Sequence, residues 1–205
     1  MVTLTKKMRN SLTPENALQM LKDGNHRFVT NLKRNHNLLQ QVNETSDEQY
    51  PFALILSCID SRTSAELIFD QGLGDIFSCR IAGNILNEDI LGSMEFACKV
   101  AGAKLIMVLG HSECGAIKGA CNNVKMGNLT GLLKKIRVVV KEFSKDKQVN
   151  QQSTDFIDLI SKENVKNVLK NIPKKSKIIH DLVKSKNVTK KNLNFIDKNY
   201  FKILI

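Results

Sequence analysis

Two short stretches of the chain combine residue types that hydrophobic packing alone rarely brings together. CIDSR (58–62) places a thiol, a carboxylic acid and a guanidinium at alternate positions, and GHSECG (110–115) places an imidazole and a thiol three residues apart. Each stretch directly follows an apolar run. Charged groups are rarely buried unless they are paired or bound to a metal, so both stretches indicate a functional site.

Cys58, His111 and Cys114 together form a Cys₂His ligand set, which is typical of zinc. Three protein ligands leave one coordination position open, and an open position distinguishes catalytic from structural zinc. Asp60 and Arg62 would lie on the same side of an extended segment as Cys58. Arg62 can hold Asp60 in a bidentate pair, and Asp60 can then accept a hydrogen bond from zinc-bound water.

The elements that must position these groups alternate between strand and helix. Continuous apolar runs are typical of strands that are covered on both faces, and the sequence predicts strands over 52–57, 75–83 and 103–110. Helical patterns follow over 64–70, 89–102, 115–124 and 129–143. We therefore expect an α/β fold with a central, mostly parallel β-sheet flanked by helices. In such sheets, sites form beyond the carboxyl ends of the strands.

The two ends of the chain are less regular. Thr13 and Pro14 predict the start of a helix, whereas residues 31–50 are expected to be irregular. Helices are expected over 162–172 and 173–186, with Pro173 opening the second, and a closing strand or hairpin over 193–205. We expect one domain over 1–205, made of a helical arm (1–50), a zinc-site core (51–145) and a C-terminal part of helices and closing strand (146–205).

Composition limits the class of protein. No apolar stretch approaches the roughly 20 residues that span a bilayer, and the first residues lack the apolar block of a secretory signal. Five cysteines, an odd number, are expected to be reduced thiols or metal ligands, so we expect a cytoplasmic location. The net charge of +11 is concentrated in residues 101–205, which hold 21 Lys+Arg and 8 Asp+Glu. We interpret these lysines as a solvated exterior, and no nucleic-acid partner is expected.

From Leu18 to about Leu133 the sequence resembles the β-class carbonic anhydrases. The resemblance is carried by LKDGNHRF, CIDSR, ELIFDQGLGDIF, RIAGN, GSMEFA, LGHSECGA and GNLTGLL. It implies reversible hydration of CO₂ to bicarbonate and a proton by zinc-bound hydroxide, with one Zn²⁺ per chain. It also implies a homodimer or an assembly of dimers, in which the N-terminal helix packs on the partner subunit and each active-site cleft lies at the subunit interface.

The resemblance also implies roles for individual residues. Cys58, His111 and Cys114 match the zinc ligands, and Asp60 and Arg62 match a catalytic acid–arginine dyad; in some members the matching aspartate becomes the fourth zinc ligand at lower pH. The positions that match substrate-binding residues are Gln49 (acting from the partner subunit), Phe77, Ala82, Phe96 and the backbone N–H of Gly115.

The sequence departs from the family at two places. Arg80 matches an arginine that binds inhibitory bicarbonate in some bacterial members, but Ile55 stands where those members have tryptophan. After Lys186 the sequence fits the family poorly. Two alternatives to carbonic anhydrase activity stay open: a related zinc hydrolase acting on a CO₂-like substrate such as carbon disulfide, and a non-catalytic, zinc-stabilised interaction protein.

Overall fold

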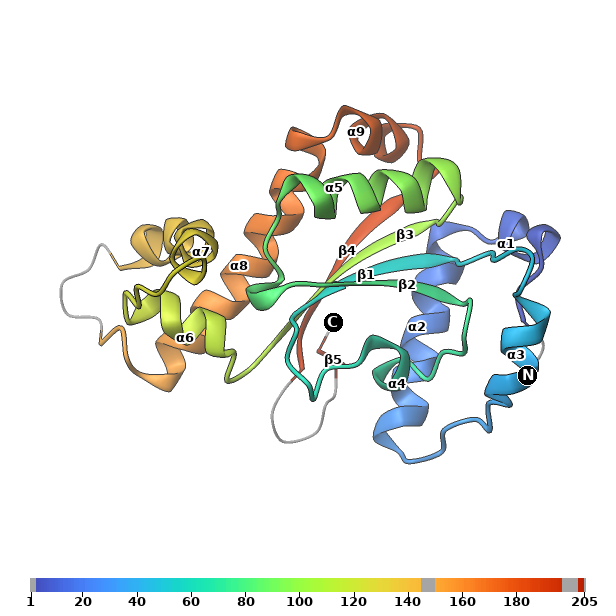
Figure 1. Cartoon of the computed structure of the whole chain (residues 1–205), viewed down its shortest axis with the longest axis horizontal. Coiled ribbons are helices and arrows are strands. Elements are labelled where there is room, and N and C mark those ends of the chain that lie inside the picture. Colours follow the sequence, from blue (N-terminus) through green and yellow to red (C-terminus); the bar gives the residue numbers. More distant parts are fainter. Residues whose placement is uncertain (1–2, 145–149, 197–202, 205) are drawn as a thin grey trace.

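One five-stranded β-sheet organises the chain. The computed structural model describes residues 3–144, 150–196 and 203–204. The strands lie in the order β2-β1-β3-β4-β5; the first four in this order are mutually parallel, and β5 runs antiparallel to β4 (Figure 1). Their bounds are β1 Ala53–Ser57, β2 Ile76–Arg80, β3 Leu105–His111, β4 Thr189–Ile196 and β5 Ile203–Leu204. The predicted α/β class and mostly parallel sheet are confirmed.

The two central strands, β1 and β3, fix the position of the reactive stretches. Every residue of ALILS in β1 and of LIMVLGH in β3 is buried, as expected for strands covered on both faces. The strands pair in parallel, with Ala53 opposite Leu105 and Ser57 opposite Leu109. The residues that follow β1 therefore meet the last residues of β3 at the same edge of the sheet.

Helices cover both faces of the sheet (Figure 1). α2 (Pro14–Val29) and α4 (Ala65–Ile68) bury apolar side chains against one face. On the other face lie α5 (Glu88–Glu95), a π-helical turn (η2, Phe96–Val100), α8 (Thr154–Lys175) and α9 (Lys177–Lys184). A third apolar cluster joins α6 (Gly115–Cys121), α7 (Leu129–Phe143) and α8 beyond the strand ends, with η1 (Ala82–Asn84) beside it. Among the described residues, each helix is too short or too polar to span a bilayer.

The N-terminal region holds more structure than its polar sequence indicates. Thr13 caps α2 by accepting from the Asn16 amide at 3.2 Å, as predicted. However, α1 (Lys6–Ser11) and α3 (Leu38–Glu44) are also present, so the prediction that 31–50 is irregular is wrong for α3. The side chain of Gln41 anchors α3: it is 2% exposed and accepts from the backbone N–H of Leu73 at 3.1 Å. The apolar side chains of α3 are exposed, so no buried apolar face identifies this helix.

Pro173 lies inside α8 and does not open the next helix, so that prediction is wrong. A proline cannot donate to the carbonyl four residues earlier, here that of Leu169. The Lys190 ammonium, on β4, donates to that carbonyl at 3.0 Å instead. The following helix, α9, begins after Ser176, whose hydroxyl accepts from the Ile179 amide at 3.1 Å. A contact distant in sequence therefore allows the proline in the last turn of α8.

The expected end of the chain is present in part. β4 begins at Thr189 and extends the sheet beside β3, and β5 pairs with it; the remaining residues of the predicted hairpin, 197–202 and 205, lie outside the described residues. The proposed division at 50 and 145 stays a prediction. The same holds for packing of the N-terminal helix on a partner. Within this chain, Arg9 of α1 is buried against Gly102.

Candidate metal centre

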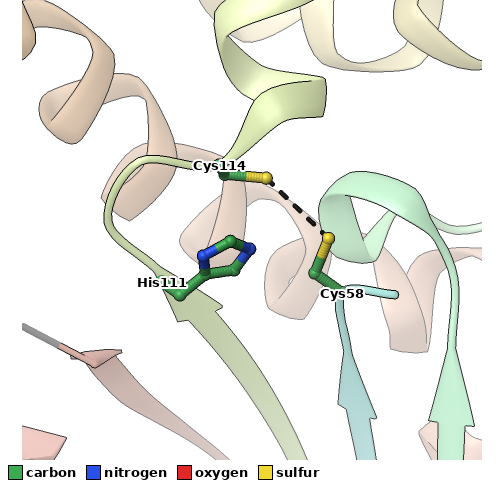
Figure 2. Close-up of side chains that lie close together, drawn as sticks. All are labelled: Cys58, His111 and Cys114. Atoms are coloured by element: carbon green, nitrogen blue, oxygen red, sulfur yellow. Dashed lines mark hydrogen bonds between the residues drawn. The ribbon is translucent and has the colours of Figure 1, made fainter. Parts of the chain in front are cut away.

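Cys58, His111 and Cys114 converge beyond the carboxyl ends of β1 and β3 (Figure 2). Cys58 follows β1, His111 is the last residue of β3, and Cys114 precedes α6. Glu113 has a left-handed backbone (φ +54°), and this turn carries the chain from β3 into α6. All three side chains are buried, at 4%, 5% and 1% exposure respectively. Parallel pairing of two buried strands thus assembles residues that are more than 50 positions apart in sequence.

The geometry of these side chains fits a zinc ion. The three ligand atoms lie within 4.8 Å of one another, and the two sulfurs are 3.9 Å apart. Two thiolates on a tetrahedral zinc, each at about 2.3 Å, stand about 3.8 Å apart. The sulfurs are too far apart for a disulfide, whose S–S bond is about 2.05 Å. These distances match the donor set expected of zinc with three protein ligands.

The His111 ring has one nitrogen available for a metal. Its Nδ1 lies 2.8 Å from the carbonyl oxygen of Ser112, so Nδ1–H donates there. Its Nε2 is buried and has no hydrogen-bond partner among the described residues. This is the arrangement of a metal-ligating histidine, in which a hydrogen bond at one nitrogen fixes the tautomer and leaves a lone pair on the other.

The Cys58 and Cys114 thiols shift each other's pKa. The Cys114 thiol donates to Cys58 and is the main reason that the pKa of Cys58 falls to about 4; the neighbouring His111 ring and backbone N–H groups lower this pKa further, and burial opposes them. The same hydrogen bond, together with burial, raises the pKa of Cys114. The Gly83 N–H also lies 3.4 Å from the Cys58 sulfur and donates to it. The pocket therefore already stabilises one thiolate, and a divalent cation would stabilise both.

Asp60 and Arg62 form the expected ion pair beside these ligands. Asp60 Oδ1 accepts from the Arg62 backbone N–H at 3.0 Å and from Nε at 2.9 Å, and Oδ2 accepts from Nη2 at 2.8 Å. The Arg62 side chain is the main reason that the pKa of Asp60 falls to about 2. The carboxylate faces Arg62 and does not belong to the group of three ligands. A metal-binding role for Asp60 stays a prediction.

Arg80 has a structural role that the sequence did not reveal. Its Nε donates to the carbonyl of Cys58 at 3.0 Å, and its Nη2 donates to the carbonyl of Asp60 at 2.6 Å. Arg80 ends β2, directly opposite Ser57 of β1. The guanidinium therefore fastens the loop that carries both a metal ligand and the dyad acid. The register of β2 against β1 was the missing information, because it alone places Arg80 beside this loop.

A small apolar cavity adjoins the ligands. Its volume is about 260 Å³, and it is lined by Cys58, Ile59, Asp60, Ala82, Gly115, Ala116, Gly119, Leu129 and Leu133. Two of the residues expected to bind substrate, Ala82 and Gly115, therefore lie beside the metal ligands. Apart from Asp60 and the thiol, the side chains of this lining are small or apolar. Such a cavity suits a small uncharged molecule.

The other expected substrate-binding residues lie elsewhere in the chain. Phe77 and Phe96 meet edge to face, with ring centroids 6.3 Å apart, and line a separate cavity of about 440 Å³ between β2 and α5. Gln49 is exposed after α3 and does not line the cavity beside Cys58. Within one chain, these three residues do not reach Cys58, and their role in substrate binding stays a prediction.

Comparison with known proteins agrees with this site. The family model described as "Carbonic anhydrase" matches residues 53–194. Carbonic anhydrase 2 of Mycobacterium tuberculosis is 44% identical over 121 residues, which cover 58% of each protein. The carbonic anhydrase of Mycolicibacterium smegmatis is 42% identical over 124 residues, covering 60% of this chain and 59% of the relative. The chain thus matches somewhat over half the length of these curated relatives.

Solved structures share the fold. The β-carbonic anhydrase CcaA superposes with a TM-score of 0.70 at 26% identity, over 88% of this chain and 90% of that one. A tetrameric β-carbonic anhydrase of Sordaria macrospora gives 0.69 at 21% identity, over 77% and 85% of the two chains, which shows likeness of fold. The family match covers β1, β2, β3 and most of β4, together with Cys58, His111, Cys114, Asp60 and Arg62. The chain therefore belongs to the β-class carbonic anhydrase family.

Proposed function

We propose that this chain catalyses the reversible hydration of carbon dioxide to bicarbonate and a proton, with Zn²⁺ held by Cys58, His111 and Cys114. The observation that carries the proposal is the Cys₂His group, closed to within 4.8 Å beside an arginine-held aspartate in a member of this family. Zinc with three protein ligands acts as a Lewis acid that brings the pKa of a coordinated water to near neutrality.

Asp60 orients the attacking water in this proposal. Three hydrogen bonds from Arg62 fix the carboxylate, and the low pKa of Asp60 keeps it ionised at neutral pH. An ionised carboxylate accepts a hydrogen bond without taking up the proton, so Asp60 directs the oxygen lone pair toward the carbon of CO₂. Arg62 positions Asp60, and Arg80 holds the backbone carbonyls of the same loop.

The small cavity receives CO₂. The side chains of Ala82, Ala116, Leu129 and Leu133 offer contact without competing hydrogen bonds, which suits a substrate that has no charge. As the C–O bond forms, negative charge develops on the substrate oxygens. The backbone N–H of Gly115, at the start of α6, is the donor in this chain that we assign to that oxygen.

We also propose that the functional unit is a homodimer or an assembly of dimers. β2 is an edge strand, and Phe96 and Val100 on the neighbouring η2 are 54% and 71% exposed. A second copy on this edge would cover them and would bring Gln49, Phe77 and Phe96 of one copy toward the ligands of the other. The related Sordaria macrospora enzyme is described as tetrameric. Mass measurement by light scattering tests this, and a stable, active monomer would contradict it.

A cytoplasmic location is part of the proposal. All five cysteines are free thiols, and Cys58 and Cys114 are held at a distance suited to a metal. Persistent free thiols fit a reducing compartment, where disulfides are rare. Fractionation of the cells that make the protein tests this point.

The decisive experiment measures CO₂ hydration by stopped flow between pH 7 and 9, with zinc content determined on the same sample. We expect about one zinc per chain and activity that is lost in Cys58→Ala and Asp60→Ala. Folded, zinc-loaded protein without CO₂ hydration would contradict the proposal. Carbon disulfide hydrolysis in that sample would identify the alternative hydrolase, and absence of both activities would favour a non-catalytic role.

A further inference from the structure

A third cavity lies between α7 and α8, on the side of α7 away from Cys58. Its volume is about 460 Å³, within the range of small-molecule sites. α7 separates it from the cavity beside Cys58: Leu129 and Leu133 line the latter, whereas Gly131, Lys134, Lys135 and Val138 line the former. The rest of its lining is Ile85, Leu86, Asn164, Asn167, Val168, Asn171 and Lys175.

The charged groups of this cavity all carry the same sign. Lys134 and Lys135 on α7 face the space that Lys175 borders from α8, and no carboxylate contributes to the lining. Within the part of the chain that the structure describes, none of the three ammonium groups has a carboxylate within 4.0 Å. Three cations that share one hollow without an anion repel one another, and an anionic ligand would relieve that repulsion.

The remaining lining supplies one polar and one apolar wall. The Nδ2 of Asn171 donates to the backbone oxygen and to the side-chain Oδ1 of Asn167, both at 2.8 Å. The second of these bonds occupies the Oδ1 of Asn167, and the Nδ2 of Asn167 donates to no described residue. Ile85, Leu86, Val138 and Val168 offer aliphatic contact. The cavity is also several times larger than a bare phosphate or sulfate ion, so it has room for an organic body beside the charged group.

We propose that this cavity binds a small organic dianion, a phosphate monoester or a dicarboxylate, with Lys134, Lys135 and Lys175 on its charged groups. The amide of Asn167 adds a neutral donor, and the aliphatic wall holds the carbon skeleton. Two negative charges match three lysines better than one does, because each ammonium gains an oxygen acceptor of its own. Neither the reaction nor the metal is needed for this binding.

A short chain of hydrogen bonds joins the cavity to the metal ligands. Asn164 lines the cavity, is 1% exposed, and donates through Nδ2 to the carbonyl of Gly83 at 2.9 Å. The N–H of the same Gly83 donates to the Cys58 sulfur at 3.4 Å. Asn164 therefore bonds one side of Gly83, at the peptide that joins it to Asn84, and Cys58 accepts from the other, at the peptide that joins it to Ala82; a ligand that shifts Asn164 acts on the residue between them. The backbone amide signal of Gly83 is the place to look for this coupling.

The experiment titrates the full, zinc-loaded chain with phenyl phosphate, succinate and inorganic phosphate at constant ionic strength. Calorimetry measures the affinity, and amide NMR follows Gly83. We expect saturable 1:1 binding of phenyl phosphate or succinate, tighter than that of inorganic phosphate, and a shifted Gly83 signal. Lys134→Ala/Lys175→Ala should weaken binding at least about tenfold, because each substitution removes a charge-assisted hydrogen bond to the dianion.

Lys184→Ala is the matched control, because Lys184 is exposed on α9 and does not line the cavity. Whichever of phenyl phosphate and succinate binds more tightly identifies the class of dianion. Two results would overturn the proposal: binding that does not saturate for either compound, or equal affinity in the double variant and in Lys184→Ala. Because the measurement is of binding, a failure here leaves the proposed CO₂ hydration untouched.

Discussion

The two cavities on either side of α7 are built in opposite ways. Beside Cys58, each described polar group is held: Arg62 fixes Asp60, Arg80 fixes the loop carbonyls, and Ser112 fixes the His111 ring. In the cavity between α7 and α8, the charges sit at the ends of long lysine side chains that have no described carboxylate partner. The first cavity is preorganised, whereas the lysines of the second would become ordered only by binding the proposed dianion.

Because of this difference, substitutions should affect the two cavities in different ways. A preorganised site loses activity when any holding contact is removed, because its groups no longer meet at the required distance. A site whose charges lie at the ends of long lysine side chains loses ligand affinity with each charge removed. The stability of the fold does not depend on those charges. Substitutions on the two sides of α7 should therefore separate into these two patterns.

The largest effect is expected from the metal ligands. Cys58→Ala removes one of three ligands, so zinc content should fall close to zero and CO₂ hydration should be lost. Cys98→Ala is the matched control: this thiol is also buried, but burial raises its pKa to about 12, and it belongs to no metal-ligand group. Zinc analysis and stopped-flow assays check both variants. Full zinc occupancy in Cys58→Ala would break the assignment.

A smaller loss of activity should follow when the loop that carries Cys58 is released. Arg80→Ala removes two hydrogen bonds to this loop while leaving every ligand in place. We expect activity or zinc affinity to fall about 10- to 100-fold, as for other groups that position metal ligands. Arg137→Ala, which removes an arginine bond to the Val124 carbonyl, should leave the zinc affinity unchanged. Equal zinc affinity and activity in Arg80→Ala and Arg137→Ala would show that the bonds from Arg80 to this loop are not needed.

Asp70 is a buried, hydrogen-bonded carboxylate that lines neither of these two cavities. Its side chain is 2% exposed and binds Arg27, the mostly buried His36 and the Arg34 amide. Burial is the largest influence and raises the pKa of Asp70, but these hydrogen bonds together outweigh it and hold the pKa below its usual value. At pH 7, Asp70→Asn should cost about 1–3 kcal/mol of unfolding free energy.

Because folding lowers the pKa of Asp70, the stability that this carboxylate contributes depends on pH. A carboxyl whose pKa is lowered by folding stabilises the protein above its unfolded pKa, near 4, and loses this contribution as the pH falls through the folded value. Urea unfolding between pH 3 and 7 should therefore show the wild type and Asp70→Asn converging toward acid. A constant difference in stability over the whole range would contradict this account.

The smallest effect on the fold is expected from the unheld lysines. Alanine at Lys134, Lys135 or Lys175 removes a charge that makes no described ion pair, so the unfolding free energy should change by less than about 0.5 kcal/mol. Thermal unfolding without ligand, compared with that of Asp70→Asn, measures this contrast. A large loss of stability would mean that these lysines support the fold, and the comparison of the two cavities would then fail.

The sequence predicted that Cys58, His111 and Cys114 meet because they follow buried apolar runs, and the structure brings them together; their role as zinc ligands stays a prediction. Such runs identify central parallel strands, and their carboxyl ends must lie at one edge, so Cys58 and His111 had to meet. Arg80 could not be read in the same way, since its role depends on the register of β2 against β1. The cavity between α7 and α8 could not be predicted either. Lysines spaced along a helix indicate a solvated face, and the cavity forms only where α7 packs on α8.

Contacts distant in sequence account for the other differences. The Pro173 prediction failed because Lys190 satisfies the carbonyl that proline cannot, and the helix at 38–44 was missed because a single buried glutamine anchors it. Phe77 and Phe96 lie on neighbouring elements as a pair, yet one chain does not place them at the metal ligands. In each case the deciding interaction joins segments that local patterns treat separately.

The split origin of the metal ligands has a consequence for how the chain folds. Cys58 directly follows the first central strand, and His111 and Cys114 come only with the second, after α4, the edge strand β2, η1, α5 and η2. Parallel pairing over such a distance is intrinsically slow. The complete three-ligand set cannot exist before β1 and β3 have paired. The rate at which refolding protein takes up cobalt in place of zinc, followed by its colour, should therefore time the formation of the sheet itself.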